Sequence, residues 1–266
     1  MSGACSFTFG GANVFNNHFF AANGNVTSPT SNSDVGNAFT LPVPLRFIGF
    51  SFVKPNVNRG EFCLTVDGAP ARYFQISGES KYTPAQFDLV LEAGSMIRLQ
   101  VTYSLQENAF LSCLITLHFV PEYSNEHVLG DFGLNVIPFG GNVNVDRRLW
   151  LRFAAQASTA LDADDKNFTT MFTVPAPMRL FRLGYQRSSL VGANLDGSLQ
   201  LYKNGAPLEH GDCTLWDASG VVDFSIPEDS PLRQLNAGDV IQVAFEHGII
   251  PGSCIITLYT TQRTAI

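Results

Sequence analysis

Positive charge is the scarcest feature of this 266-residue sequence. Charged residues make up only 15% of it, the net charge is −7, and the lysines are Lys54, Lys81, Lys166 and Lys203. A nucleic-acid-binding surface neutralises phosphates with several clustered cations, and the sequence has no cluster of lysines and arginines. The composition therefore predicts that nucleic acid is not a partner.

Long apolar runs and a basic leader are also missing. No stretch of about 18 uninterrupted apolar residues occurs, so the sequence predicts no membrane-spanning helix and no membrane partner. Residues 1–7 contain neither a basic residue nor an apolar run, which predicts no signal peptide. The cysteines are odd in number and form no C-x-x-C pair: Cys5, Cys63, Cys113, Cys213 and Cys254. We expect free, mostly buried thiols in a protein that folds in a reducing cytoplasm.

Helical periodicity is absent as well. No segment repeats apolar residues at i, i+3, i+4 and i+7 over ten or more positions, and residues 153–161 and 107–114 only approach this pattern. Short alternating runs separated by Gly, Pro and Asn take its place. Residues 62–66, for example, alternate and end at Asp67–Gly68, a strong hairpin signal. This pattern predicts an all-β sandwich, with β-hairpins between short strands.

The sequence repeats itself. Residues 39–46 (FTLPVPLR) and 172–179 (FTVPAPMR) share Phe, Thr, both prolines and Arg. Further matches follow in the same order: Phe9–Gly11 with Phe139–Gly141, Asp67–Pro70 with Asn204–Pro207, Leu91–Leu99 with Leu235–Val243, and Ser112–Leu117 with Ser253–Leu258. The spacing between matched segments drifts from about 130 to about 144 residues, as loop insertions produce.

This duplication predicts two tandem jelly-roll-type β-sandwich domains. The first covers residues 1–121, a linker covers 122–136, and the second covers 137–266. About eight strands in each half, with long loops between the sheets, favour a jelly roll over an up-and-down barrel. The immunoglobulin-like alternative lacks its Cys…Trp…Cys spacing in both halves.

The candidate catalytic and metal-binding groups each have an ordinary structural interpretation. No H-x-H or H-x-x-x-H pair occurs among the histidines: His18, His118, His127, His210 and His247. The acidic loop 162–167 lacks the glycine and closing glutamate of a calcium loop. No G-x-S-x-G is present, and Cys113 and Cys254 lie in apolar runs where thiols act as small hydrophobes.

Three further side chains could have contacted a sugar. Asp223 has apolar neighbours, but we place it on the solvent face of a strand, and Trp150 and Trp216 are interpreted as a strand residue and a loop residue. We therefore predict no catalytic, cofactor-binding or metal-binding residues and no cofactor.

The chain resembles the jelly-roll structural proteins of bacteriophage virions. The resemblance rests on the tandem repeat, the paired prolines before a strand, and two phrases, LNAGDVIQV (235–243) and SCIITLY (253–259). It implies a non-enzymatic virion protein made in the host cytoplasm, most of all a capsid decoration or cement protein. Its partners would be the major capsid protein or neighbouring copies of itself, in a homo-oligomer.

Two other virion roles remain open at this stage. One is a double jelly-roll major capsid protein, and the other is a tail or spike protein that binds a receptor or a carbohydrate. We expect the repeated segments to be scaffold, with Arg46 and Arg179 sharing a common structural partner. Binding is expected where the halves differ, at Asn23–Asn37, Gln186–Asp196 and His210–Ser219.

Overall fold

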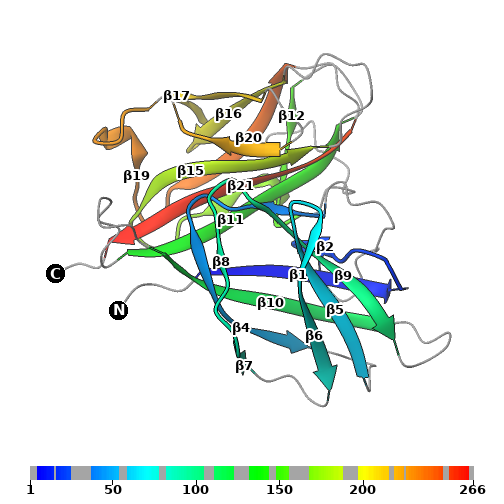
Figure 1. Ribbon diagram of the computed structural model, residues 1–266. Helices are drawn as coiled ribbons and strands as arrows, with labels where there is room; N and C mark the ends of the chain where they lie inside the picture. Colours follow the sequence, from blue (N-terminus) through cyan, green and yellow to red (C-terminus); the bar gives the residue numbers. More distant parts are fainter. Residues whose placement is uncertain are drawn as a thin grey trace. The chain divides into compact units, whose positions relative to one another are not determined.

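The chain consists of two all-β units. The computed structural model describes residues 5–14, 16–24, 37–53, 59–77, 82–104, 111–122, 132–143, 148–155, 168–187, 197–215, 219–224, 226–247 and 252–263. These residues form an N-terminal unit within Ala4–Glu126 and a C-terminal unit within His127–Ile266. Their strands pair only antiparallel, and the described parts contain no α-helix (Figure 1). None of their helical turns could cross a membrane.

The N-terminal unit contains two sheets. One has the strand order β2-β1-β10-β4-β7, with β8 also paired to β4, and the other has the order β3-β9-β5-β6. The strands are β1 (Cys5–Val14), β2 (Ala21–Ala22), β3 (Phe39–Thr40), β4 (Leu45–Val53), β5 (Arg59–Val66), β6 (Ala69–Ser77), β7 (Thr83–Pro84), β8 (Val90–Leu91), β9 (Met96–Ser104) and β10 (Leu111–Pro121).

The C-terminal unit also contains two sheets. One has the order β13-β11-β21-β15-β18, with β19 paired to β15, and the other has the order β12-β20-β16-β17, with β14 paired to β20. The elements are β11 (Phe132–Val143), β12 (Leu149–Trp150), β13 (Arg152–Phe153), η1 (Phe168–Thr170), β14 (Phe172–Thr173), β15 (Met178–Arg187), β16 (Gly197–Lys203), β17 (Ala206–Leu215), β18 (Ser219–Val222), η2 (Pro231–Arg233), β19 (Gln234–Leu235), β20 (Val240–His247) and β21 (Gly252–Arg263).

Phenylalanine fills the core of the N-terminal unit. The Phe62 ring of β5 stacks on Phe74 of β6 with centroids 4.9 Å apart, and it meets Phe50 of β4 edge-on at 5.5 Å. Phe7 of β1 similarly meets Phe39 of β3 at 5.1 Å. Because the Phe62–Phe50 and Phe7–Phe39 contacts join strands of different sheets, the two sheets face each other as a sandwich. Alternation along the strands supplies the rings, since every second side chain points inward.

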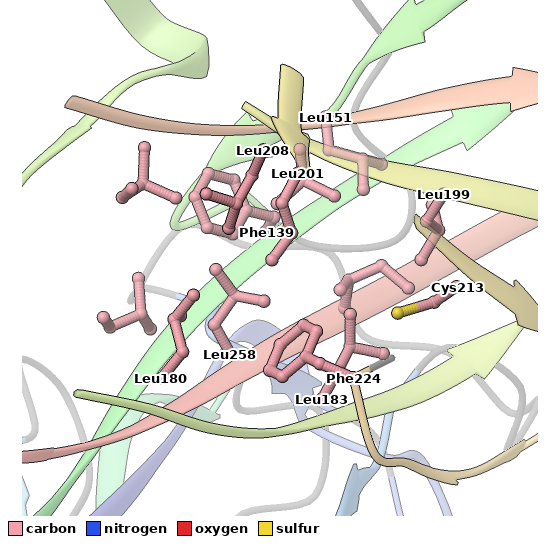
Figure 2. Close-up of a cluster of buried hydrophobic side chains, with 14 of the residues drawn as sticks. Phe139, Leu151, Leu180, Leu183, Leu199, Leu201, Leu208, Cys213, Phe224 and Leu258 are labelled. Atoms are coloured by element: carbon pink, nitrogen blue, oxygen red, sulfur yellow. The ribbon is translucent and has the colours of Figure 1, made fainter. Parts of the chain in front are cut away.

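Aliphatic side chains dominate the core of the C-terminal unit. Figure 2 shows Leu180, Leu183 and Leu258 from one sheet meeting Leu199 and Leu201 from the other. All five side chains are buried. The sandwich class predicted from alternation and turn residues is therefore confirmed for the described parts of both units.

Tight hairpins close β5–β6 and β16–β17. Asp67 and Gly68 have φ angles of 51° and 83°, and Asn204 and Gly205 have φ angles of 54° and 81°. Two successive positive φ angles define the type I′ turn that Asp-Gly and Asn-Gly favour. Asp67 also accepts a hydrogen bond from the Met96 amide at 2.7 Å. The predicted hairpin at Asp67–Gly68 is confirmed.

The repeated proline-containing segment carries the chain from one sheet to the other. In the N-terminal unit, Phe39 pairs with Ile97 in one sheet, whereas Leu45 pairs with Pro121 and Leu91 in the other. The two prolines lie between these strands, where a residue without an amide hydrogen removes no ladder bond.

The predicted linker is shorter in the structure. Strand β10 ends at Pro121, and β11 begins at Phe132, inside the range 122–136 assigned to the linker. Phe132–Val136 pairs with β21 residues Arg263–Tyr259. The prediction was wrong there because residues 132–136 were read as a continuation of the polar stretch before them.

Arg233 is a buried cation held by backbone carbonyls. Its side chain is 4% exposed, and its guanidinium donates to the Ile226 carbonyl at 2.9 and 2.7 Å and to the Phe181 carbonyl at 3.0 Å. Burial lowers the pKa of this guanidinium. These bonds tie η2 to the segment before it and to strand β15.

Replacing Arg233 is expected to destabilise the C-terminal unit. An Arg233→Met variant keeps much of the side-chain volume but leaves two carbonyls without their charged donor, so we expect the free energy of unfolding to fall by about 2–4 kcal/mol. Urea denaturation measures this loss. The control is Arg182→Met, because Arg182 forms a solvent-exposed pair with Asp223 and should cost less than about 1 kcal/mol. Equal losses in the two variants would contradict the role assigned to Arg233.

Candidate functional site

A row of polar side chains crosses the sheet of β1, β10 and β4 on the face turned away from the core. Its centre is His118 of β10, whose neighbours Leu117 and Phe119 point inward and are fully buried. The His118 Nδ1 atom lies 2.8 Å from the Ser6 hydroxyl of β1, and Nε2 lies 2.9 Å from the Ser51 hydroxyl of β4. One imidazole thus joins three strands.

The same row continues with hydroxyl groups. Thr8 of β1 and Thr116 of β10 form a hydroxyl–hydroxyl hydrogen bond of 3.1 Å, two residues along from the Ser6–His118 pair. Side chains two residues apart on a strand share a face, so these groups belong to one surface. We call Ser6, Thr8, Ser51, Thr116 and His118 the hydroxyl row.

Tyr82 lies at one end of the hydroxyl row, beside His118. Its ring centroid lies 5.7 Å from that of His118, its hydroxyl donates to the Ile48 carbonyl at 2.8 Å, and 54% of its surface is exposed. A Cβ at Gly49 would lie 2.9 Å from the tyrosine ring and 2.5 Å from the Thr83 carbonyl oxygen. Glycine at position 49 therefore makes room for the ring against the sheet.

The hydroxyl row carries no formal charge when His118 is neutral. Partial burial lowers the pKa of His118 from its ordinary value of 6.5, which favours the neutral imidazole at pH 7. One ring nitrogen then donates to a serine hydroxyl and the other accepts from one. Such a surface can hydrogen-bond amides and hydroxyls of another molecule without attracting or repelling charge.

The lowered pKa of His118 predicts that the stability of the fold depends on pH. Because its pKa is lower in the folded state, protons bind the unfolded chain first as the pH falls below about 6.5, and the folded state loses stability in that window. We expect His118→Gln to flatten the fall in unfolding free energy between pH 6.5 and pH 5, measured by urea denaturation. His210→Asn is the control, since His210 is exposed and its φ of 56° suits asparagine. An unchanged slope in His118→Gln would contradict this assignment.

The other histidines do not join His118. His210 lies on the edge strand β17, with Nε2 3.7 Å from the Glu209 carboxylate. His18 is half-buried and its carbonyl accepts from the Val101 amide. His127 and the side chain of His247 lie outside the described residues. Across the described ranges, no three His, Cys, Asp or Glu side chains come together in a way that could hold a metal ion.

Trp150 lies in a small buried cluster. Only 4% of its surface is exposed, and its ring meets Tyr202 at 4.6 Å with Ala244 beside them. Because the ring is covered, it does not form a sugar-stacking platform, and the interpretation of Trp150 as a strand residue is confirmed by β12. Trp216 and the acidic loop 162–167 lie outside the described residues.

Asp223 and the mid-strand cysteines have structural roles. Asp223 follows β18, is exposed, and accepts from Arg182 Nε at 2.8 Å, so the prediction of a solvent-facing carboxylate is confirmed although the residue lies just beyond the strand. Cys113 and Cys254 are buried within β10 and β21, as small hydrophobic side chains are.

The two repeated arginines have different surroundings. Arg46 makes a two-pronged ion pair with Glu122, with Nε 2.7 Å from one carboxylate oxygen, and it also contacts Asp88. Arg179 forms no ion pair with any residue that the structure describes. The expectation of a common partner was wrong, because Gln234 pairs with Arg179 where Val90 pairs with Arg46, and the acidic residues have no counterparts in place.

The segments where the halves differ fall largely outside the described residues. This holds for 25–36, 188–196 and 216–218. Of the remaining residues, Gln186 is buried in β15, and His210–Leu215 forms part of β17. Sequence reasoning instead missed the hydroxyl row. Its signal was the alternation of polar with aromatic residues in Ser6-Phe7-Thr8 and of polar with apolar residues in Thr116-Leu117-His118.

Comparisons with known proteins identify no family for this chain. No family model matches the sequence, and no curated protein matches it significantly. Among solved structures, the chain is similar to a Paenibacillus xanthan lyase, with a TM-score of 0.24 and 11% identity over 95% of this chain and 25% of that one. It is also similar to a BuGH86 variant in complex with neoagarooctaose, with a TM-score of 0.22 and 11% identity over 97% of this chain and 34% of that one. The chain thus spans a quarter to a third of these proteins, and the scores support no inference about function.

Proposed function

We propose that this chain is a non-enzymatic structural protein of a bacteriophage virion, and that it decorates the capsid and stabilises the shell through its surfaces. In this proposal its two units are jelly-roll domains that arose by duplication. The observation that carries it is the pattern of strand pairing within each unit.

The pairing in the N-terminal unit fits a rolled-up hairpin. Strand β1 pairs with β10, β3 with β9, β4 with β8, and β5 with β6, so the pairs are nested along the chain, from the outermost strands to the innermost hairpin. A jelly roll is an antiparallel ribbon of this kind folded into two sheets. The short strands β2 and β7 are additions at the sheet edges.

The pairing in the C-terminal unit follows the same plan. Strand β11 pairs with β21, β14 with β20, β15 with β19, and β16 with β17. The β10–β4 pair has a register shift between His118 and Phe119. The repeat matches these residues with Tyr259 and Thr260 of β21, and the β21–β15 pair has a register shift at that same place. A register shift at matched positions supports common descent of the two halves more strongly than a shared fold class does.

Two related domains in one chain suit a decoration protein. If each domain engages one of two equivalent sites on a shell, the linkage raises the overall affinity without any new contact. The uncharged hydroxyl row offers hydrogen bonds to a protein surface, and the net charge of −7 disfavours the packaged nucleic acid as a partner. The partners would be the major capsid protein and neighbouring copies.

Binding to shells tests this function. We expect the purified chain to co-sediment with capsids assembled from the major capsid protein of the same virus, and to appear as density on their outer surface in a particle map. A control with capsids that already carry their full complement of the protein should show no further binding. A chain that is absent from virions and does not bind shells would overturn the proposal.

A second candidate is a tail or spike protein that binds carbohydrate. One observation favours it: the exposed Tyr82 ring lies beside the hydrogen-bonding groups of His118 and Ser51, and sugars bind to such combinations of a ring and hydroxyls. A glycan array would show specific binding that Tyr82→Ala abolishes and Tyr73→Ala, at an exposed tyrosine of β6, leaves intact. Absence of any glycan binding would leave capsid decoration as the sole proposal.

A further inference from the structure

Strand β6 (Ala69–Ser77) is a long edge strand. It ends the sheet β3-β9-β5-β6, and β5 is the one described strand with which it pairs (Figure 1). The backbone amides and carbonyls along the outer side of an edge strand can pair with another chain, so proteins usually guard such edges with bulges and charged side chains.

The matching strand of the C-terminal unit is guarded in this way. Strand β17 (Ala206–Leu215) ends the sheet β12-β20-β16-β17 and is interrupted by a register shift against β16. His210 there has a φ of 56°, which breaks the extended backbone, and exposed Glu209 and Asp212 add negative charge. A second strand would meet both a kink and like charges at this edge.

Strand β6 also has a register shift against its neighbour, between Pro70 and Arg72, but it has no kink and no negative charge. Its register with β5 is continuous from Arg72 to Ser77, and none of its residues has a positive φ. Arg72 carries the strand's single charge, and its guanidinium lies 4.8 Å from the centroid of the Phe87 ring. Tyr73 and Gln75, which point away from the core, are exposed and uncharged, and Tyr73 is 57% exposed.

We propose that the free edge of β6 pairs with β6 of a second copy of this chain. Antiparallel pairing of a strand with itself has two-fold symmetry, so both copies use the same residues, and the two four-stranded sheets would join into one of eight strands. A second copy fits this edge because its outward side chains are neutral, whereas a partner recognised by charge would find little to match. Tyrosines brought across the junction add an aromatic contact.

This assignment rests on the β6 edge and not on the virion role. It goes beyond the proposed function by naming the surface through which copies meet. Because one added strand pair makes a modest interface, we expect a dimer that dissociates in the micromolar range, detectable by sedimentation of the full chain over a range of concentrations.

Charge variants of Tyr73 provide the test. Tyr73→Lys and Tyr73→Glu should each raise the dissociation constant of the dimer about tenfold or more, because they place like charges near the two-fold axis, and an equal mixture of the two should recover the dimer. Thr214→Lys, at an exposed position on β17, is the matched control and should leave dimerisation unchanged. Circular dichroism verifies that each variant is folded.

Amide hydrogen exchange gives a readout that needs no variant. Exchange within residues 69–77 should slow as the concentration of the unaltered chain rises, while exchange within β17 should not change. A chain that stays monomeric at high micromolar concentration, or a dimer that Tyr73→Lys leaves intact, would overturn the proposal. A monomer that still binds shells would refute β6 pairing alone and leave capsid decoration standing.

Discussion

All five cysteines are expected to resist a thiol reagent such as DTNB at pH 8 while the protein is folded. Their side chains are between 0% and 4% exposed. Burial also raises the pKa of Cys5, Cys113 and Cys213 from an ordinary value of 9.0 to about 12. At pH 8 this lowers the fraction of reactive thiolate in each of the three by about a thousandfold, in addition to the steric protection.

Unfolding is the control for this protection. In denaturant, all five thiols should react within the time that a free cysteine takes, so the ratio of the two rates reports burial directly. Rapid labelling of even one cysteine in the folded protein would contradict its buried position, and mass spectrometry of the labelled peptides would identify which one.

The same thiols predict a loss of stability in alkali. A thiol whose pKa is raised on folding contributes its full stability below pH 9, and this contribution falls as the pH rises from 9 towards 12, because the unfolded chain releases its protons first. We expect the free energy of unfolding to decrease across this window. A Cys113→Ala variant, which removes one such group, should show a shallower decrease, and an unchanged slope would contradict the raised pKa of Cys113.

The Phe62→Ala variant is expected to lose about 3–5 kcal/mol of unfolding free energy. Phe62 is fully buried and lies between the rings of Phe74 and Phe50, so truncation leaves a cavity at the centre of the aromatic core and removes two ring contacts. The loss falls on the N-terminal unit. Denaturant unfolding followed by tyrosine fluorescence and circular dichroism would measure it.

Val53→Thr serves as the control for Phe62→Ala. Val53 lies at the end of β4 and is 54% exposed, and threonine keeps its β-branched shape. The expected change is within about 0.5 kcal/mol. A small loss for Phe62→Ala, close to that of the control, would show that the aromatic core can collapse around the missing ring or that Phe62 does not lie at its centre.

The fold class could be predicted because alternation and turn chemistry act locally. Leu64 and Val66 flank Thr65 in a period of two, and Asp67–Gly68 has the backbone freedom that a tight hairpin needs, so strands and turn follow from a few residues. The start of β11 was harder to predict, because Gly133 and Asn135, which are uncommon in strands, alternate with its apolar residues, and pairing with β21 completes the strand. Tertiary pairing overrode weak local preference there.

The surface was harder to predict than the core. Ser6, Ser51 and His118 lie on three strands far apart in the sequence, and only the register of β1 and β4 against β10 brings them together. Trp150 was ambiguous for a related reason: a tryptophan on a two-residue strand could be open or covered, and Tyr202 and Ala244, which decide this, come from β16 and β20.

Pairing of the first strand with the last has a consequence for the timing of folding. Ser6 and His118 are 112 positions apart, so the outermost ladder of the N-terminal unit forms only after nearly all of that unit has been synthesised. Contacts of such high sequence separation slow folding, because the loop between them must be ordered first. We expect the hairpin β5–β6, at the centre of the unit, to form earlier, because its contacts are local. During translation the N-terminal unit therefore completes its ladder after residue 121 emerges, while the second half of the chain is still being made.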